Sequence, residues 1–258
     1  MNVPRPGAPR IIVCDDANAL TQRAAALFRD AAAAAIAAGR RFSVALAGGS
    51  TPRGLYRLLA TPETPGDAID WNNVELFFGD ERTVPPEHPD SNFGMARDAL
   101  LSRVAIPVDN IHRLPGEAPD LDGAARAYEQ TLRARVAGDN VPTLDFALLG
   151  MGPDGHTASL FPGTTALDER ERLCVPVDVP QMKTRRLTLT YPMFLRARAV
   201  VFLIAGADKA QTLRAVVEGP DRPRELPCQV IVRGAGSVSI LCDRAAASAL
   251  GANTQGES

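Results

Sequence analysis

The stretch LDFALLGMGPDGHTASLFPG, residues 144–163, joins an apolar run to a turn rich in glycine. The run from Leu144 to Leu149 predicts a buried β-strand, and His156, one of three histidines in the chain, follows its carboxyl end. Ligands of open α/β sheets bind outside the carboxyl ends of the strands, and histidine titrates near neutral pH. The stretch therefore predicts a catalytic histidine. A tight turn that holds an ordinary loop histidine is the alternative interpretation.

A second strand-to-helix junction lies in FSVALAGGSTPRGLY, residues 42–56. The first backbone N–H groups of a helix have no partner within the helix, and together with the helix dipole they favour an anion. Glycines there allow close backbone approach, and hydroxyl groups add donors. The junction predicts a phosphate cradle made by Gly48, Gly49, Ser50 and Thr51. A plain N-capped helix explains the same residues, since neither the Walker pattern nor the dinucleotide glycine pattern is present.

A third apolar run, VELFF at residues 74–78, ends in charged residues that include Asp80 and Arg82. Arginine suits an oxyanion or a phosphate because its planar fork matches their oxygen atoms. These charges are expected either to face a crevice shared with the other two strand ends or to form an ordinary solvated turn.

Strand and helix patterns alternate along the whole chain. Strands are predicted at residues 10–14, 43–48, 74–78, 111–114, 144–149, 174–179, 186–190, 200–204, 230–233 and 238–242. Helices are predicted at residues 18–38, 52–59, 92–101, 122–136, 192–196 and 209–217. This alternation is typical of an α/β fold with a mostly parallel, Rossmann-like sheet and helices on both faces. We expect one domain over residues 1–258 with a small additional lobe, and frayed tails at residues 1–9 and 251–258.

Charge and cysteine usage exclude several classes of function. The net charge is −2, with 28 basic residues dispersed among 30 acidic ones, which argues against a nucleic-acid surface. The four cysteines form no Cys-x-x-Cys pair, so zinc and redox motifs are absent and buried, reduced thiols are expected. No export signal is expected, because residues 1–10 contain three prolines and no apolar region. No membrane span is expected either, because Arg29 and Asp30 interrupt the short alanine-rich stretch at residues 24–38. A cytoplasmic location is the expectation.

Five segments in this order and spacing resemble the glucosamine-6-phosphate deaminase/6-phosphogluconolactonase family, and specifically its lactonases. They are AGGSTP at 47–52, FGDER at 78–82, SN at 91–92, GMGPDGHTASLFPG at 150–163 and RLTLT at 186–190. The similarity extends from Ile11 to about Asp243. It implies the deaminase/isomerase-like fold and hydrolysis of 6-phosphoglucono-δ-lactone to 6-phosphogluconate in the oxidative pentose phosphate pathway, with no cofactor and no metal.

The resemblance and the chemistry of lactone hydrolysis together assign roles to individual residues. His156 is expected to act as general base, Asp154 to orient it or the sugar, and Arg82 to contact an oxyanion or a hydroxyl group. Asp80 occupies the position that resembles the base of the deaminases. The implied phosphate contacts are Arg186, Lys183 and Lys209, although basic loops are more often simply exposed. The partner is a phosphorylated sugar lactone, and the protein is expected to be a monomer or a weak homodimer.

Two other functions compete with lactone hydrolysis. A glucosamine-6-phosphate deaminase would share the cradle and the Asp-Gly-His turn, but its pattern has a glutamate shortly after the histidine, and Thr157 to Thr165 contains none. A sugar-phosphate sensor of the kind found in transcriptional regulators would need an added DNA-binding module. Only residues 1–9 precede the first predicted strand.

Overall fold

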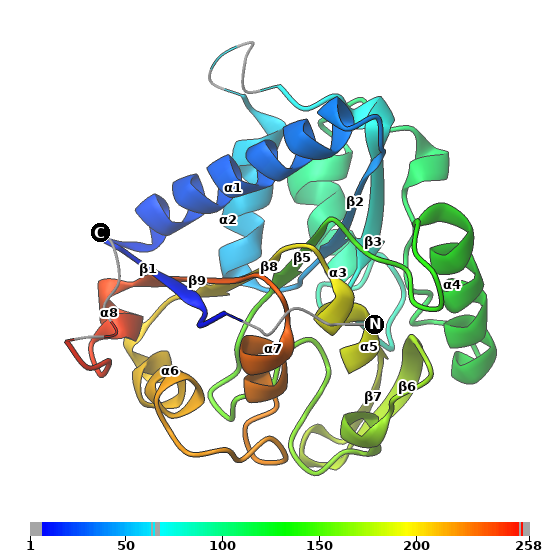
Figure 1. Ribbon diagram of the computed structural model, residues 1–258. Coiled ribbons are helices and arrows are strands. Elements are labelled where there is room, and N and C mark those ends of the chain that lie inside the picture. Colours follow the sequence, from blue (N-terminus) through cyan, green and yellow to red (C-terminus); the bar gives the residue numbers. More distant parts are fainter. Residues whose placement is uncertain (1–6, 63, 65–67, 253, 255–258) are drawn as a thin grey trace.

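The structure is a computed structural model that describes residues 7–62, 64, 68–252 and 254 (Figure 1). Its strands are β1 Arg10–Cys14, β2 Phe42–Leu46, β3 Val74–Phe78, β4 Asp80–Arg82, β5 Phe146–Leu149, β6 Cys174–Val179, β7 Thr184–Leu189, β8 Val200–Ile204 and β9 Val238–Asp243. Its α-helices are α1 Ala17–Ala37, α2 Ser50–Ala60, α3 Asn92–Ala96, α4 Leu121–Arg135, α5 Tyr191–Arg196, α6 Ala210–Val217, α7 Cys228–Gly234 and α8 Arg244–Ala247.

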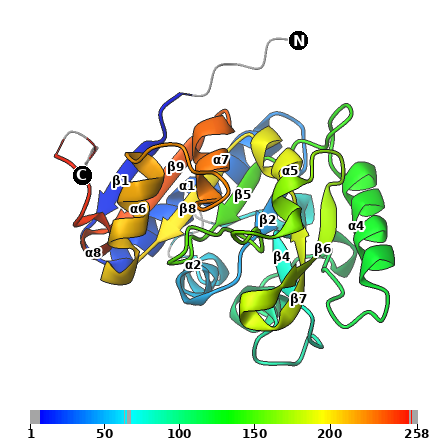
Figure 2. The ribbon, with the colours of Figure 1, turned by 90° about the horizontal axis from the view of Figure 1, so that it is seen from below.

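A six-stranded parallel sheet forms the centre of the fold. Its strands lie in the order β1-β9-β8-β5-β2-β3, and every neighbouring pair is parallel. Helices α1 and α2 lie over one face, and α6 and α7 lie over the other (Figures 1 and 2). Strands β2, β3, β5 and β8 are buried along their whole length, as expected for a sheet covered on both faces. The predicted fold class is confirmed.

The order of the strands reverses direction between β2 and β5. From β2 the chain continues outward to the edge strand β3, whereas from β5 it continues the other way, to β8 and then β9. The two connections therefore leave opposite sides of the β2–β5 pair and open a crevice beyond its carboxyl ends. This is the position at which open α/β sheets bind their ligands.

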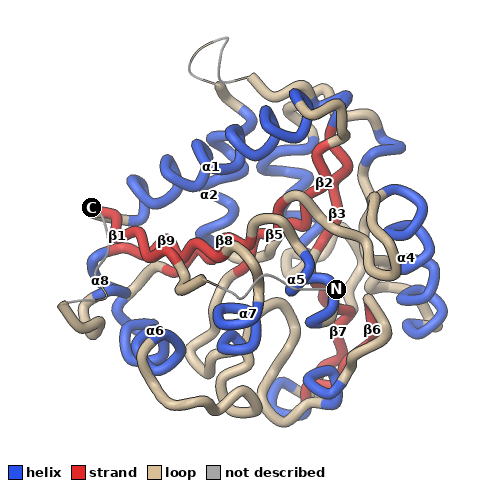
Figure 3. The backbone as a smooth tube through the Cα atoms, in the orientation of Figure 1, coloured by secondary structure: helices blue, strands red, loops and turns tan. Residues whose placement is uncertain are grey.

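A second, smaller sheet makes the predicted additional lobe. It consists of three antiparallel strands in the order β4-β7-β6, and β6 and β7 lie apart from the row of parallel strands (Figure 3). Gly79 joins the two sheets. Its N–H donates to the carbonyl of Leu46 in β2 at 2.8 Å, and its carbonyl accepts from the N–H of Leu189 in β7 at 2.8 Å.

Aromatic side chains fix helix α1 on the parallel sheet. The Asp16 side chain caps α1 by accepting from the N–H of Ala19 at 2.8 Å. Phe28 of α1 is fully buried, and its ring meets those of Phe42 and Phe146 edge to face at centroid distances of 5.1 and 5.5 Å. This cluster holds α1 against β2 and β5, the two strands at the crevice.

The strand predicted at 230–233 is wrong, because these residues belong to helix α7. A four-residue apolar run does not distinguish a strand from a buried helical turn. Pro227 precedes the helix, and the Gln229 amide donates to the carbonyls of Ala215 and Pro220, contacts that only the folded chain provides.

Two smaller predictions also fail. Residues 111–114 form no strand, and only Ile111 makes an isolated bridge, to Leu76. Strand β4 was expected to be a charged loop, yet Asp80 and Glu81 are buried within it. The predicted frayed tails fall largely outside the described residues, although the N–H of Gly251 donates to Glu218 at 2.7 Å.

Truncation of the aromatic cluster tests how strongly α1 depends on it. Phe28→Ala is expected to lower the free energy of unfolding by about 3–5 kcal/mol, because it removes a fully buried ring and leaves a cavity. Urea denaturation measures the change, with Phe28→Leu as the matched variant that retains most of the volume. A loss below about 1 kcal/mol for Phe28→Ala would show that the cluster does not anchor the helix.

Candidate active site

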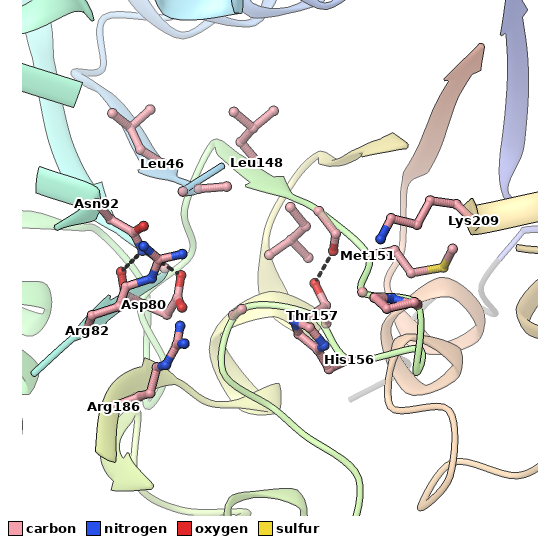
Figure 4. Close-up of a pocket in the computed structure, with 18 residues that line it drawn as sticks. Leu46, Asp80, Arg82, Asn92, Leu148, Met151, His156, Thr157, Arg186 and Lys209 are labelled. Carbon is pink, nitrogen blue, oxygen red and sulfur yellow. Dashed lines mark hydrogen bonds between the residues drawn. The ribbon is translucent and has the colours of Figure 1, made fainter. Parts of the chain in front are cut away.

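A pocket of about 270 Å³, lined by both polar and apolar residues, lies beyond the carboxyl ends of β2 and β5 (Figure 4). Its walls come from the turns after these strands, from the β3–β4 segment, from the start of α3, and from β7 and the turn after β8. The sequence segments that were expected to share a crevice therefore do so. The lining residues are Leu46, Ala47, Gly48, Gly79, Asp80, Arg82, Asn92, Leu148, Leu149, Gly150, Met151, Gly152, Pro153, His156, Thr157, Ala158, Arg186 and Lys209.

The imidazole of His156 is fixed by three neighbours. Asp154 Oδ1 lies 2.5 Å from Nδ1, and the His156 ring stacks on Phe161 with centroids 4.0 Å apart. Gly152 lies under the ring so closely that a Cβ there would come within 2.1 Å of Nδ1. Since Nδ1 faces Asp154, the other ring nitrogen, Nε2, is available to accept a proton.

Asp154 is suited to holding this histidine. Burial opposes ionisation of the carboxyl, but the hydrogen bond and charge of His156 outweigh it, so the pKa of Asp154 lies below its ordinary value. Near neutral pH the side chain is therefore a carboxylate that can accept a hydrogen bond from Nδ1–H of His156. The turn is strained as well, because Ala158 adopts φ 49° and non-glycine residues enter this left-handed region at a cost of about 1–3 kcal/mol.

Asp80 is held by two neutral donors on the opposite wall. Ser159 Oγ donates to its Oδ2 at 2.7 Å, and Asn92 Nδ2 donates to its Oδ1 at 3.1 Å. The Asn92 amide also donates to the Asp80 carbonyl at 2.9 Å, which fixes the orientation of the amide. Its Oδ1 lies so close to Gly48 that a Cβ on Gly48 would come within 1.8 Å of it.

Arg82 and Arg186 bring two positive charges to the same wall as Asp80 (Figure 4). One guanidinium nitrogen of Arg82 donates to the carbonyl of Asp90. Burial lowers the pKa of Arg186, although the nearby Asp80 carboxylate works in the opposite direction. The Nε atoms of Arg82 and Arg186 are buried and have no acceptor among the described residues. These donors make the wall suitable for oxygen-rich, negatively charged groups.

Glu81 supports this wall from behind. Its carboxylate accepts from the N–H groups of Arg82, Asn92 and Phe93, each at 2.8 Å, and from the Ser91 hydroxyl at 3.1 Å. Burial raises the pKa of Glu81 above its ordinary value, while the backbone donors partly offset that effect. The buried carboxyl thus ties β4 to the first turn of α3 and sets the position of Asn92.

The predicted phosphate cradle is only partly in the pocket. Gly48 lines it, whereas Gly49, Ser50 and Thr51 are not among the lining residues. Helix α2 begins at Ser50, and no side chain caps it, so its first N–H groups keep their affinity for an anion.

The two predicted lysines lie in different places. Lys209 lines the pocket and appears on the opposite side from Arg186, with Nζ 3.0 Å from Asp208 (Figure 4). Lys183 is not brought into the pocket. It lines a separate surface hollow with Thr83 at the tip of the β6–β7 hairpin.

Asn92, Ser159 and Phe161 lie in the sequence motifs described above, but no role was predicted for them. Asn92 and Ser159 are buried partners of Asp80, and Phe161 lies between His156 and the Arg186 guanidinium, which is 5.8 Å from the ring centroid. The only sequence signal was their place in the quoted motifs, since none of them is ionisable.

The structure also bears on the cysteines, on groups of possible metal ligands and on membrane-spanning helices. All four cysteines are free and buried, as expected. Within the described ranges, no three histidine, cysteine or carboxylate side chains come together in a way that would suit a metal ion. None of the described helices is long and apolar enough to cross a membrane.

Comparison with known proteins places the chain in a family. The family described as Glucosamine-6-phosphate isomerases/6-phosphogluconolactonase matches residues 15–240. A 6-phosphogluconolactonase from Synechocystis sp. is 40% identical over 226 residues, 87% of this chain and 91% of the relative. The solved 6-phosphogluconolactonase from Trypanosoma cruzi has a TM-score of 0.80 at 31% identity, covering 94% of this chain and 97% of that one. A monomeric glucosamine-6-phosphate deaminase has a similar fold, with a TM-score of 0.78 at 24% identity over 93% of this chain and 99% of that one.

A parallel sheet with a histidine-containing pocket at its switch point defines an α/β protein that binds a small ligand there. The chain belongs to the glucosamine-6-phosphate isomerase/6-phosphogluconolactonase family.

The contact between Gly48 and Asn92 can be tested by filling the space. Gly48→Ala is expected to lower kcat/KM about tenfold or more, because it displaces Asn92 and with it Asp80, and a shift of about 1 Å in a site can cost ~10²-fold. Gly236→Ala, where a Cβ meets open space, is the matched control. Combined with Asn92→Ala, the Gly48→Ala change should add no further loss. Additive losses would contradict the proposed contact.

Proposed function

We propose that this protein hydrolyses 6-phosphoglucono-δ-lactone to 6-phosphogluconate in the oxidative pentose phosphate pathway. The observation that supports this most is the placement of His156, which is oriented by Asp154 and Phe161 and lies in one pocket with Asp80, Arg82 and Arg186. A base with a free nitrogen, facing cationic hydrogen-bond donors, is what the hydrolysis of a phosphorylated lactone requires.

The reaction needs a water, a base and an oxyanion contact. His156 Nε2 takes a proton from a water molecule as its oxygen attacks the lactone carbonyl carbon, while Asp154 stabilises the imidazolium that forms. Arg82 contacts the carbonyl oxygen as it becomes negatively charged. When the tetrahedral intermediate collapses, the bond between the carbonyl carbon and the ring oxygen breaks. The ring oxygen then takes the proton back from His156 and becomes the free hydroxyl group of the product.

Arg186 is proposed to hold the phosphate. It is buried, and its Nε has no acceptor among the described residues. Its guanidinium carbon lies 5.8 Å from the centroid of the Phe161 ring, on which the His156 ring stacks. A phosphate bound there would position the lactone relative to the base through one rigid side chain. Lys209, across the pocket, is the alternative phosphate contact, and Gly48 with the uncapped start of α2 adds donors on the main chain.

The deaminase alternative has less support from the site. Asp154 is the carboxylate that contacts His156, and residues 157–165 supply no glutamate. Asp80 does line the pocket, but Ser159 and Asn92 both donate to its carboxylate, and a carboxylate held in this way is suited to accepting a hydrogen bond from a sugar hydroxyl. No observation favours the sensor alternative.

Freshly generated 6-phosphoglucono-δ-lactone tests the proposal. Proton release above the spontaneous rate is expected, with no ammonia formed from glucosamine 6-phosphate under the same conditions. Ammonia release without lactone hydrolysis would identify a deaminase, and tight binding of sugar phosphates without turnover would identify a sensor.

Assembly and location are also proposals. The buried free thiols fit a reducing compartment, so we place the protein in the cytoplasm. We propose a monomer or a weak homodimer that needs no cofactor and binds neither nucleic acid nor membrane.

Removal of the proposed base should affect the chemical step. His156→Ala is expected to lower kcat by about 10²-fold or more with a modest change in KM, since general-base catalysis contributes about 10²–10⁴-fold. Steady-state kinetics measure this, with circular dichroism to confirm folding and added imidazole to restore part of the rate. Turnover like that of the wild type would remove His156 from the mechanism.

Removal of the proposed phosphate contact should affect binding. Arg186→Ala is expected to raise KM for the phosphorylated lactone about tenfold or more, because a charge-assisted hydrogen bond contributes about 1.5–3 kcal/mol. The preference over unphosphorylated gluconolactone should narrow, since that substrate never makes the contact. Lys209→Ala, measured in parallel, tests the alternative. Equal loss of both activities in a folded Arg186→Ala variant would place Arg186 in the chemical step or the scaffold.

A further inference from the structure

Four arginines converge on a hollow outside the active site. The hollow, of about 320 Å³, lies between α2 and residues 87–103, and we name it the arginine groove. Arg53 and Arg57 enter it from α2, and Arg97 and Arg103 enter it from the opposite side. None of these four residues lines the catalytic pocket.

The groove has more positive charge than its own carboxylates neutralise. Among the residues that line the groove, the carboxylates are Glu87 and Asp98, and Asp98 is already paired with Arg97 at 3.1 Å. The Asp90 carboxylate lies beside the groove, 3.7 Å from His88 Nδ1. Arg53 and Arg57 are four residues apart on α2, so they project from neighbouring turns of one helix face, where like charges repel. Across the described ranges neither guanidinium has a hydrogen bond or ion pair to the protein. A bound anion would relieve this repulsion.

A short chain of contacts links the groove to the active site through the peptide groups of residue 90. The N–H of Asp90 donates to Nδ1 of His88, which lines the groove, at 3.1 Å. The carbonyl of Asp90 accepts from Arg82, which lines the catalytic pocket. Displacement of His88 would therefore move an acceptor of an active-site arginine.

We propose that the arginine groove is a second anion site, which binds a phosphate group and shifts the position of Arg82 through residue 90. Phosphate fits because guanidinium groups offer forked donors that match its oxygens, and several converging arginines are the usual means of recognising it. Inorganic phosphate and the phosphate of a small ester share this chemistry. The groove differs from the catalytic pocket because four arginines line it, against two arginines and one lysine in the pocket.

Amide chemical shifts in nuclear magnetic resonance titrations test the proposal. Inorganic phosphate and, separately, glucose 6-phosphate are added to the wild-type protein, with ionic strength held constant by chloride. Saturable shifts are expected at residues 53–57, 88–90 and 97–103, together with Arg82. Tighter binding of the ester than of inorganic phosphate would identify an organic phosphate as the ligand.

Two double variants separate the groove from surface charge in general. Arg53→Ala/Arg57→Ala should weaken phosphate binding at the groove about tenfold or more, while any shifts around His156 persist. Arg126→Ala/Arg133→Ala on α4 is the control that removes the same charge elsewhere and should leave groove binding unchanged. Equal weakening by both variants, or shifts confined to the catalytic pocket, would overturn the site. Saturation of the groove without any shift at residues 82 and 90 would overturn the coupling to Arg82.

Discussion

At Gly79 the chain leaves the parallel sheet and enters the antiparallel one, and the active site depends on this crossing. The Gly79 N–H continues the pairing of β3 with β2, whereas its carbonyl already pairs with β7. Asp80 therefore starts a new strand beside β7 at the mouth of the β2–β5 crevice. Its carboxylate is then fixed by Ser159 from the histidine loop and by Asn92 from α3. One side chain thus connects three segments, which are β4, the start of α3 and the histidine loop.

Because the side chains at this connection are buried, their charged groups need hydrogen-bond donors from the protein. Asp80 and Glu81 are almost completely buried, and an unpaired buried carboxylate is costly, so both must find donors. The N–H groups at the start of α3 supply those donors to Glu81, and the Ser159 hydroxyl supplies one to Asp80. The helix start is therefore both an electrostatic support for β4 and the element that positions the pocket wall.

The sequence predicted those parts of the fold that depend on local pattern. Buried parallel strands are continuous apolar runs, so β2, β3, β5 and β8 were recognisable. Strand β4 was not, because its residues are charged and become buried only through donors from distant segments. The apolar run in α7 was assigned to a strand because its helical partners lie elsewhere in the chain.

The same distinction applies to the site. His156 and Asp154 could be proposed from the sequence because they are ionisable neighbours at a strand end. Arg82 and Arg186 could be proposed because they lie in motifs that resemble those of the family. Lys183 was placed by sequence position alone, and the hairpin carries it to a different hollow. Neutral partners such as Asn92, Ser159 and Phe161 gain their importance from contacts that only the three-dimensional structure reveals.

In the proposed mechanism, this pocket holds the lactone with its carbonyl carbon against His156 and its phosphate at Arg186. A crystal structure with bound 6-phosphogluconate tests it most directly, because the product retains both ends of the substrate. The new carboxylate is expected within hydrogen-bonding distance of His156 Nε2, about 3 Å, with the phosphate on the Arg186 guanidinium. A product bound with its phosphate beside His156 and its carboxylate beside Arg186, or bound outside this pocket, would contradict it.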